Sequence, residues 1–185
     1  MAGAVTQQLM GEIRLAWWRE NLDSLFEGGP RRHPVLDALS GAAREGRLSR
    51  TALEAMVEAR HAELDEDGLA DDAQRLAYID ATAGLVMVEA ARWLDPAAKP
   101  ETVASAARAW GWAALARAKR ITPEMARPRI AEALRAARAE LRDLPVAAFP
   151  AAAYATLAPL YLKWREPSDL ERRARLVWAT VRGRP

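Results

Sequence analysis

The stretch GEIRLAWWRENLD, residues 11–23, is the most informative part of the chain. Its apolar side chains recur every three or four residues, together with those just outside it, as on one side of an α-helix. They form one stripe of Leu9, Ile13 and Trp17 and a neighbouring stripe of Trp18, Leu22 and Leu25. The spacing predicts a helix over residues 5–26, which Gly28 and Gly29 end.

The rest of the chain is punctuated by Pro and Gly into further helices, which makes roughly eight in all. Ser49, Asp71 or Asp72, and Ser168 are predicted N-caps because their side-chain oxygens can accept a hydrogen bond from the first turn. The remaining predicted helices cover residues 34–46, 50–68, 72–94, 100–121, 123–143, 147–164 (with a kink at Pro159) and a last segment after Ser168. No fixed-period repeat or long linker divides the chain, so we expect one domain over residues 1–185.

Composition supports the same all-α fold class. Hydrophobic residues make up 51% of the 185 residues, aromatic residues only 6%, and alanine, the best helix former, supplies much of the rest. Strand-forming residues are sparse. On the predicted apolar stripes we expect five side chains to be largely buried: Trp17, Leu22, Tyr78, Ala83 and Val86.

Charge and cysteine content exclude several classes of protein. The net charge is only +2, which does not suit a nucleic-acid-binding protein. The absence of cysteine excludes disulfides and thiolate chemistry. No signal peptide and no apolar run of about 20 residues, the length of a membrane span, can be recognised. We therefore expect a cytoplasmic protein without a transmembrane span, with peripheral contact with the inner membrane as a further alternative.

The chain contains no phosphate-binding loop, dinucleotide-binding turn or nucleophile elbow. His33 and His61 lie far apart in the sequence, outside any metal-binding spacing, and we interpret His33 as a loop residue. An acidic cluster surrounds Gly68 and could in principle hold Mg²⁺, but we interpret it as a solvated helix end with a cap. Its members are Glu63, Asp65, Glu66, Asp67, Asp71 and Asp72.

Seven tryptophans are unusual beside two Phe and three Tyr. The adjacent Trp17 and Trp18 point about 100° apart on a helix, and both can be partly buried if helices pack on two sides. We favour a role in the core over an aromatic ligand pocket for these side chains.

Residues 11–23 resemble the "RL-x-WWR-x-x-L" helix of the squalene/phytoene synthase family, especially its proteobacterial branch. Further resemblances follow in the order of the family. HPVLDAL (33–39) resembles its "PV-x-x-AL" stretch, and VEARHAELD (57–65) resembles its "I-x-AR-x-x-DL" helix less closely. YIDATAGLVM (78–87) is similar to its "Y-x-x-x-x-AG-x-V" helix, and PLYL (159–162) to its "P-x-YL" helix.

This resemblance implies the isoprenoid-synthase fold, a helical bundle around a central cavity. In active members of the family, two prenyl diphosphates are condensed head to head there. Two aspartate-rich motifs on facing helices hold the Mg²⁺ ions that absorb the charge of the leaving diphosphate. On this basis, the candidate cavity-lining residues are Trp17, Trp18, Arg60, Tyr78 and Gly84.

The sequence departs from the family pattern in two places. Residues 1–10, where the leading helices and the first aspartate motif are expected, contain no Asp or Glu. Residues 104–120, where the second motif is expected, read ASAARAWGWAALARAKR and contain none either. We therefore expect a bundle without its leading helices and a pseudoenzyme with no catalytic residues, metal ligands or cofactor. Arg117, Lys119 and Arg120 could attract a diphosphate only as static charges.

Three hypotheses about function stay open. The first is a non-catalytic protein that binds a prenyl chain, a quinone or another lipid, or that assists assembly, as the mitochondrial relatives do for respiratory complex I. The second is a Mg²⁺-dependent prenyl diphosphate transferase of isoprenoid biosynthesis that needs an N-terminal part or a partner subunit. The third is a helical protein–protein adaptor. Under each hypothesis we expect a homo- or hetero-oligomer, because an uncovered apolar groove favours association.

The first prediction concerns the fold class. The circular dichroism spectrum should show the strong double minimum of α-helix, because alanine-rich, helically spaced sequence dominates the chain. A spectrum dominated by strand would contradict it.

Overall fold

A computed structural model describes residues 2–29, 33–65, 67–163 and 166–183, with the backbone alone for residues 2–6. Within these ranges all regular structure is helical and no strand occurs, as predicted. The backbone divides into two compact units, Met1–Thr82 and Ala83–Pro185. The single domain expected over residues 1–185 stays a prediction.

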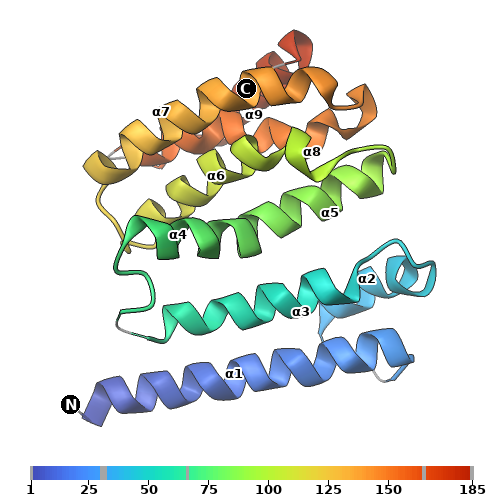
Figure 1. Ribbon diagram of the computed structural model, residues 1–185, viewed down its shortest axis with the longest axis vertical. Helices are drawn as coiled ribbons and strands as arrows, with labels where there is room; N and C mark the ends of the chain where they lie inside the picture. The colour runs from blue at the N-terminus through green and yellow to red at the C-terminus, as the bar shows by residue number, and fades with distance from the viewer. Residues whose placement is uncertain (1, 30–32, 66, 164–165, 184–185) are drawn as a thin grey trace. The chain divides into compact units, whose positions relative to one another are not determined.

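The described residues of the first unit form mainly α-helices, with one 3₁₀ segment. They are α1 (Ala2–Glu27), α2 (Pro34–Arg44), α3 (Arg50–Ala59), η1 (Arg60–Glu63) and α4 (Asp72–Ile79). Helices α2 and α3 both pack on α1, and α3 lies beside α1 in Figure 1. Buried Leu22, Leu25 and Leu36 form the core at this contact, with half-buried Trp18 and Leu53 packed around them.

Side-chain caps explain where several helices begin. The Oγ of Ser49 accepts a hydrogen bond from the Ala52 N–H (3.1 Å), and the Oγ of Ser168 accepts one from Glu171 (3.2 Å). Asp71 and Gln74 form a reciprocal capping box at the start of α4. These three predicted caps are confirmed. His33 caps α2, because its Nδ1 accepts the Val35 N–H (3.2 Å), so this side chain has a local structural role that the loop interpretation missed.

The second unit is arranged around one helix, α6 (Ala104–Arg117), which packs against both α7 (Pro123–Glu140) and η6 (Tyr154–Leu162). Its buried residues lie all around the helix, and most are small: Ser105, Ala106, Ala107, Ala109, Gly111 and Ala113, beside the larger Trp112 and Leu115. The remaining elements are α5 (Leu85–Leu94), η3 (Pro100–Thr102), η4 (Leu141–Asp143), η5 (Val146–Ala148), α8 (Phe149–Ala153) and α9 (Asp169–Arg182).

A carboxylate from another helix closes the N-terminus of α6. The backbone N–H of Ser105 donates to Glu140 at 2.9 Å, and its hydroxyl donates to the same carboxylate at 2.6 Å. Helix N-termini leave N–H groups without intrahelical partners and favour negative charge. Glu140, at the last turn of α7, therefore links the end of α7 to the start of α6.

Prolines alter two of the predicted helices. The helix predicted over residues 147–164 is instead a short α8 followed by the long 3₁₀ segment η6, which contains Pro159. Pro159 has no N–H to continue an α-helical ladder. The helix predicted from residue 100 becomes the 3₁₀ turn η3 followed by α6, whereas α7 passes through Pro128 without ending.

The helix predicted over residues 72–94 contains a π-helical turn, η2 (Asp80–Gly84). A π turn holds an extra residue, so the apolar face beyond it moves by one position. Met87 is 5% exposed and Ala91 1%, while Val86 is 50% exposed. The predicted burial of Val86 is therefore wrong, because it assumed uninterrupted α-helical spacing.

The four other side chains that were expected to be largely buried differ in their burial. Leu22 is buried, as predicted. Trp17, Tyr78 and Ala83 have intermediate burial, so these three side chains are partly shielded from water, but less than Leu22 is. Trp17 and Tyr78 make polar and edge contacts near the surface, and Ala83 lies in the π turn itself.

The register shift in α5 gives the second prediction. Met87→Ala should lower the free energy of unfolding by about 2–4 kcal/mol, since it leaves a cavity. Val86→Ala, one residue away, should change it by about 0.5 kcal/mol or less because that side chain faces solvent. Urea denaturation of both variants measures the difference. Equal losses, or a larger loss at Val86, would contradict the register.

Candidate functional site

A groove of about 470 Å³ lies within the first unit, between α1, α2, α3 and the η1 turn. Each of the three helices contributes one apolar wall. From α1 come Leu15, Trp18 and Leu22; from α2, Val35, Leu36 and Leu39; from α3, Leu53, Met56 and Val57; and Leu64 follows η1. The volume is that of a pocket for a small organic ligand.

Helical spacing explains why these side chains meet. Gly11, Leu15, Trp18 and Leu22 follow one another at three- and four-residue steps, which places them on one face of α1. A second series of lining residues runs along α3 into η1 and contains Leu53, Met56, Val57 and Arg60. At the end of the groove, a Cβ at Gly11 would lie 2.3 Å from the Cδ2 of Leu64. The missing side chain of Gly11 therefore lets Leu64 pack directly against α1.

One end of the groove is charged. Arg14, Arg60 and Glu63 are its ionisable lining residues. The guanidinium of Arg60 donates to the carboxylate of Glu63 and also to the hydroxyl of Tyr78, at 2.7 Å for the latter. The Tyr78 hydroxyl in turn donates to Glu63. This network ties α4 to η1 and fixes the position of Arg60 at the rim.

The network changes the acidity of Tyr78. Burial raises its pKa to about 12, and the hydrogen bond to Glu63 acts in the same direction, while the Arg60 charge opposes both. Tyr78 therefore stays protonated and acts as a hydrogen-bond donor to Glu63 throughout the physiological range.

An aromatic cluster stands beside the groove. The rings of Trp17 and Trp18 meet edge to face with centroids 5.1 Å apart, and the His33 ring lies 5.0 Å from that of Trp18. Such edge contacts are favourable because the positive edge of one ring meets the negative face of another. The cluster fixes Trp18, which forms part of the groove wall.

The five candidate cavity residues are only partly brought together. Trp18 and Arg60 line the groove, Tyr78 hydrogen-bonds to Arg60, and Trp17 contacts Trp18. Gly84 lies in the π turn and belongs to the second unit. Sequence reasoning missed Arg14 and Glu63, although Arg14 lies four residues before Trp18 and the spacing could have revealed it.

The acidic cluster has ordinary structural roles. Asp71 caps α4, Asp72 pairs with Arg75 at 3.0 Å, and the carboxylate of Asp65 accepts the Asp67 N–H. Glu66 lies outside the described residues. Across the described ranges, no three acidic or histidine side chains are grouped as metal ligands.

The α1–α3 groove and the all-helical architecture define a helical protein with a largely apolar groove. The model of the squalene/phytoene synthase family matches residues 1–117, more than half of the chain, and includes every residue of the groove. The chain belongs to the squalene/phytoene synthase family, which implies the isoprenoid-synthase helical fold.

No curated protein and no solved structure matches the chain significantly. Among the described residues, no helix has the length and apolar character needed to cross a membrane.

The third prediction follows from Tyr78. Because its folded-state pKa of about 12 exceeds the ordinary value near 10, its contribution to stability is fully present below about pH 10 and is lost as the pH rises towards 12. The free energy of unfolding should therefore differ more between wild type and Tyr78→Phe at about pH 8 than at about pH 11.

Denaturant titration at the two pH values measures this difference. Spectrophotometric titration of the native protein is the independent check, since the late phenolate signal should vanish in Tyr78→Phe. A stability difference that does not change with pH would contradict the assignment.

Proposed function

We propose that the protein is a non-catalytic member of its family that binds a prenyl chain or a similar lipid chain in the α1–α3 groove. The observation that carries this proposal is the groove itself, whose three walls are apolar and whose one end is charged. An amphiphile with a hydrocarbon chain and a polar or anionic head matches this distribution.

The walls supply most of the affinity in this proposal. Apolar surface removed from water contributes about 25 cal/mol per Å², and a hydrocarbon chain needs no hydrogen-bond partner along the walls. At the charged end, Arg14 and Arg60 line the groove together with the single carboxylate of Glu63. The balance of charge there is positive and favours an anionic or polar head.

The non-catalytic part of the proposal rests on the composition of α6. Ionisation of a prenyl diphosphate requires cations that absorb the charge of the leaving group, and carboxylates from opposed helices normally hold them. Residues 104–120 contain no carboxylate, and within α6 most side chains are small and buried. The guanidinium carbon of Arg117 lies 4.2 Å from the centroid of the Tyr161 ring, so this arginine has a cation–π partner within the protein.

The enzymatic alternative requires carboxylates from outside this sequence, either from a longer chain or from a partner subunit, together with Mg²⁺. The assembly role rests on analogy with relatives. The adaptor hypothesis requires the tryptophan-rich helix to be exposed to a partner, whereas Trp17 and Trp18 of α1 are half-buried. Binding of a lipid chain in the groove is therefore the property to test directly.

The fourth prediction uses a matched pair of variants. Val35 lines the groove and Val86 does not, and each is 50% exposed. Val35→Asp should weaken binding of farnesol at least about 10-fold, because a charge in an apolar site must be desolvated. Val86→Asp should leave the affinity unchanged.

Quenching of tryptophan fluorescence on titration with farnesol provides the measurement, and circular dichroism confirms that both variants are folded. An aspartate near the N-terminus of α2 is compatible with the helix dipole, so Val35→Asp should fold. Failure of the wild type to bind farnesol, or equal loss in both variants, would overturn the proposal.

The fifth prediction concerns catalysis. Purified protein incubated with labelled farnesyl or geranylgeranyl diphosphate, NADPH and Mg²⁺ should form no squalene or phytoene above a boiled control, because no carboxylate set is provided by α6. Formation of either hydrocarbon would establish the enzyme and refute the non-catalytic proposal, while leaving chain binding in the groove intact.

A further inference from the structure

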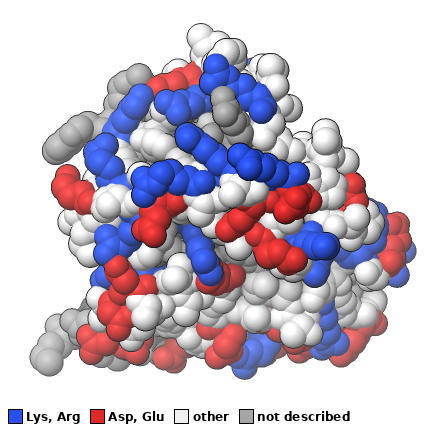
Figure 2. Space-filling view, turned by 45° about the horizontal axis from the view of Figure 1, so that its top comes forward, with Lys and Arg blue, Asp and Glu red and all other residues white. Residues whose placement is uncertain are grey.

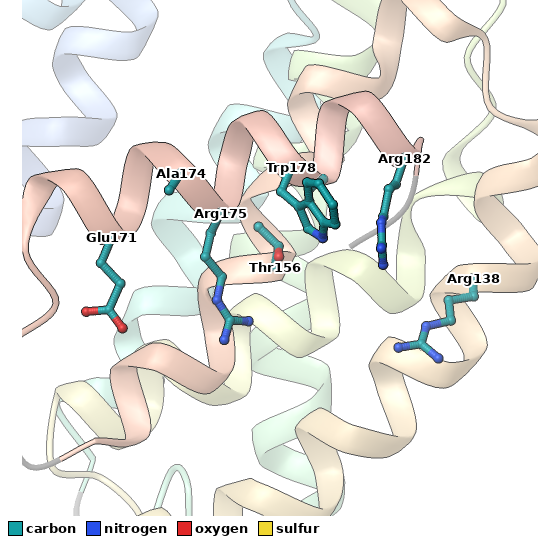
Figure 3. A pocket seen from close by; sticks show the side chains of 8 residues that line it. Arg138, Thr156, Glu171, Ala174, Arg175, Trp178 and Arg182 are labelled. Carbon is teal, nitrogen blue, oxygen red and sulfur yellow. The ribbon is translucent and has the colours of Figure 1, made fainter.

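The second unit contains a larger pocket, of about 760 Å³, between α7, η6 and α9. All of its lining residues fall between residues 138 and 182, beyond the part of the chain that the family model matches. Figure 3 shows side chains from α9 on one side and Arg138 from α7 on the other, directed into the same space. The pocket is separate from the α1–α3 groove.

Basic side chains dominate this pocket. Arg138, Arg175 and Arg182 line it, and Glu171 is the single acidic lining residue. The carboxylate of Glu171 accepts a hydrogen bond from Lys163 Nζ at 2.8 Å, so a further cation offsets its charge. Figure 2, whose view brings the region of α7 and α9 forward, shows basic side chains gathered on this face. The local potential is therefore positive.

Ordinary structural roles do not account for the three arginines. On α9, Arg172 makes the local ion pair with Asp169, at 2.6 Å. Within the described ranges, no ion pair joins Arg138, Arg175 or Arg182 to an acidic side chain. The helix dipole favours a cation in the last turn, which explains Arg182 but neither Arg175, two turns earlier, nor Arg138 on another helix.

Two neighbours shape the site. The guanidinium carbon of Arg182 lies 4.1 Å from the centroid of the Trp178 ring, a cation–π contact that restrains the arginine. Thr156, on η6, is nearly buried and contributes a hydroxyl between the helices. Figure 3 shows Thr156 and Arg175 among the side chains that line the pocket. The pocket therefore offers both guanidinium and hydroxyl donors to an anion.

We infer that this pocket binds a phosphate monoester or a diphosphate group. Guanidinium groups from two helices converge on one space, and each can donate two parallel hydrogen bonds to an oxyanion. A carboxylate has two oxygens and one negative charge, whereas a phosphate monoester or diphosphate has more oxygens and a charge that matches several arginines. The group belongs either to a free phosphorylated molecule or to a lipid headgroup.

In the first experiment, the full chain is titrated with inorganic diphosphate at low ionic strength. Calorimetry measures the binding, and the melting temperature is measured with and without diphosphate. Diphosphate should bind and raise the melting temperature, since a ligand of the native state stabilises it. Arg138→Gln, Arg175→Gln and Arg182→Gln should each weaken binding by about 10-fold or more. Arg173→Gln is the matched control, because Arg173 is an exposed arginine of α9 outside the pocket.

A second arm identifies the source of the phosphate group. Phosphatidylcholine vesicles with and without phosphatidic acid are sedimented with wild type and with the Arg175→Gln variant. Sedimentation that requires both phosphatidic acid and Arg175, and that diphosphate inhibits, assigns the group to a lipid headgroup. Diphosphate binding without such sedimentation assigns it to a free molecule. Either result supports the site.

Two results would overturn the inference. Absence of diphosphate binding by the wild type refutes it. A loss of diphosphate affinity in Arg173→Gln as large as in the pocket variants also refutes it, because the affinity would then reflect the overall charge of α9. Farnesol, the probe of the α1–α3 groove, has no phosphate group, so this test and that of the groove can fail independently.

Discussion

The packing of α6 is the constraint on which the second unit depends. A helix enclosed on several sides can approach its neighbours closely only if its side chains are small, and the buried alanines and Gly111 of α6 meet this requirement. Buried carboxylates along such a helix would be costly unless paired. The carboxylate of Glu140, on α7, accepts hydrogen bonds from Ser105 at the N-terminus of α6. The same composition that permits the packing leaves α6 without groups to hold a divalent cation.

The first unit is held together by an apolar core shared among its helices. Buried Leu22, Leu25 and Leu36 form a core shared by α1 and α2, and Leu53 and Val57 of α3 pack against it. The apolar faces are wider than this core needs, so part of each face lines the groove. Exposed ion pairs also connect α1 and α3, such as Arg19–Glu58 at 2.5 Å, but pairs of this kind contribute at most about 1 kcal/mol. The unit is therefore held by its core, and the groove is a consequence of how that core is shared among three helices.

The two units use arginine in contrasting ways. In the groove, Arg60 is held by Glu63 and Tyr78, and the hydrophobic walls provide the larger surface. In the pocket of the second unit, the arginines outnumber the carboxylates and the apolar contribution is smaller. We propose hydrocarbon recognition for the first set of residues and phosphate recognition for the second, and the two sets share no residue.

Local sequence by itself determined the helical class, the caps at Ser49, Asp71 and Ser168, and the burial of Leu22, because these depend on side chains a few residues apart. The motif order around Trp17 and Trp18 also indicated the family that residues 1–117 match. Tertiary structure decided the rest. The π turn at Asp80–Gly84 moved the buried face from Val86 to Met87, which no uninterrupted period predicts. Long-range packing alone could bring Arg138 to Arg175 and Arg182, since residues distant in sequence meet only when helices dock and bury a shared apolar surface.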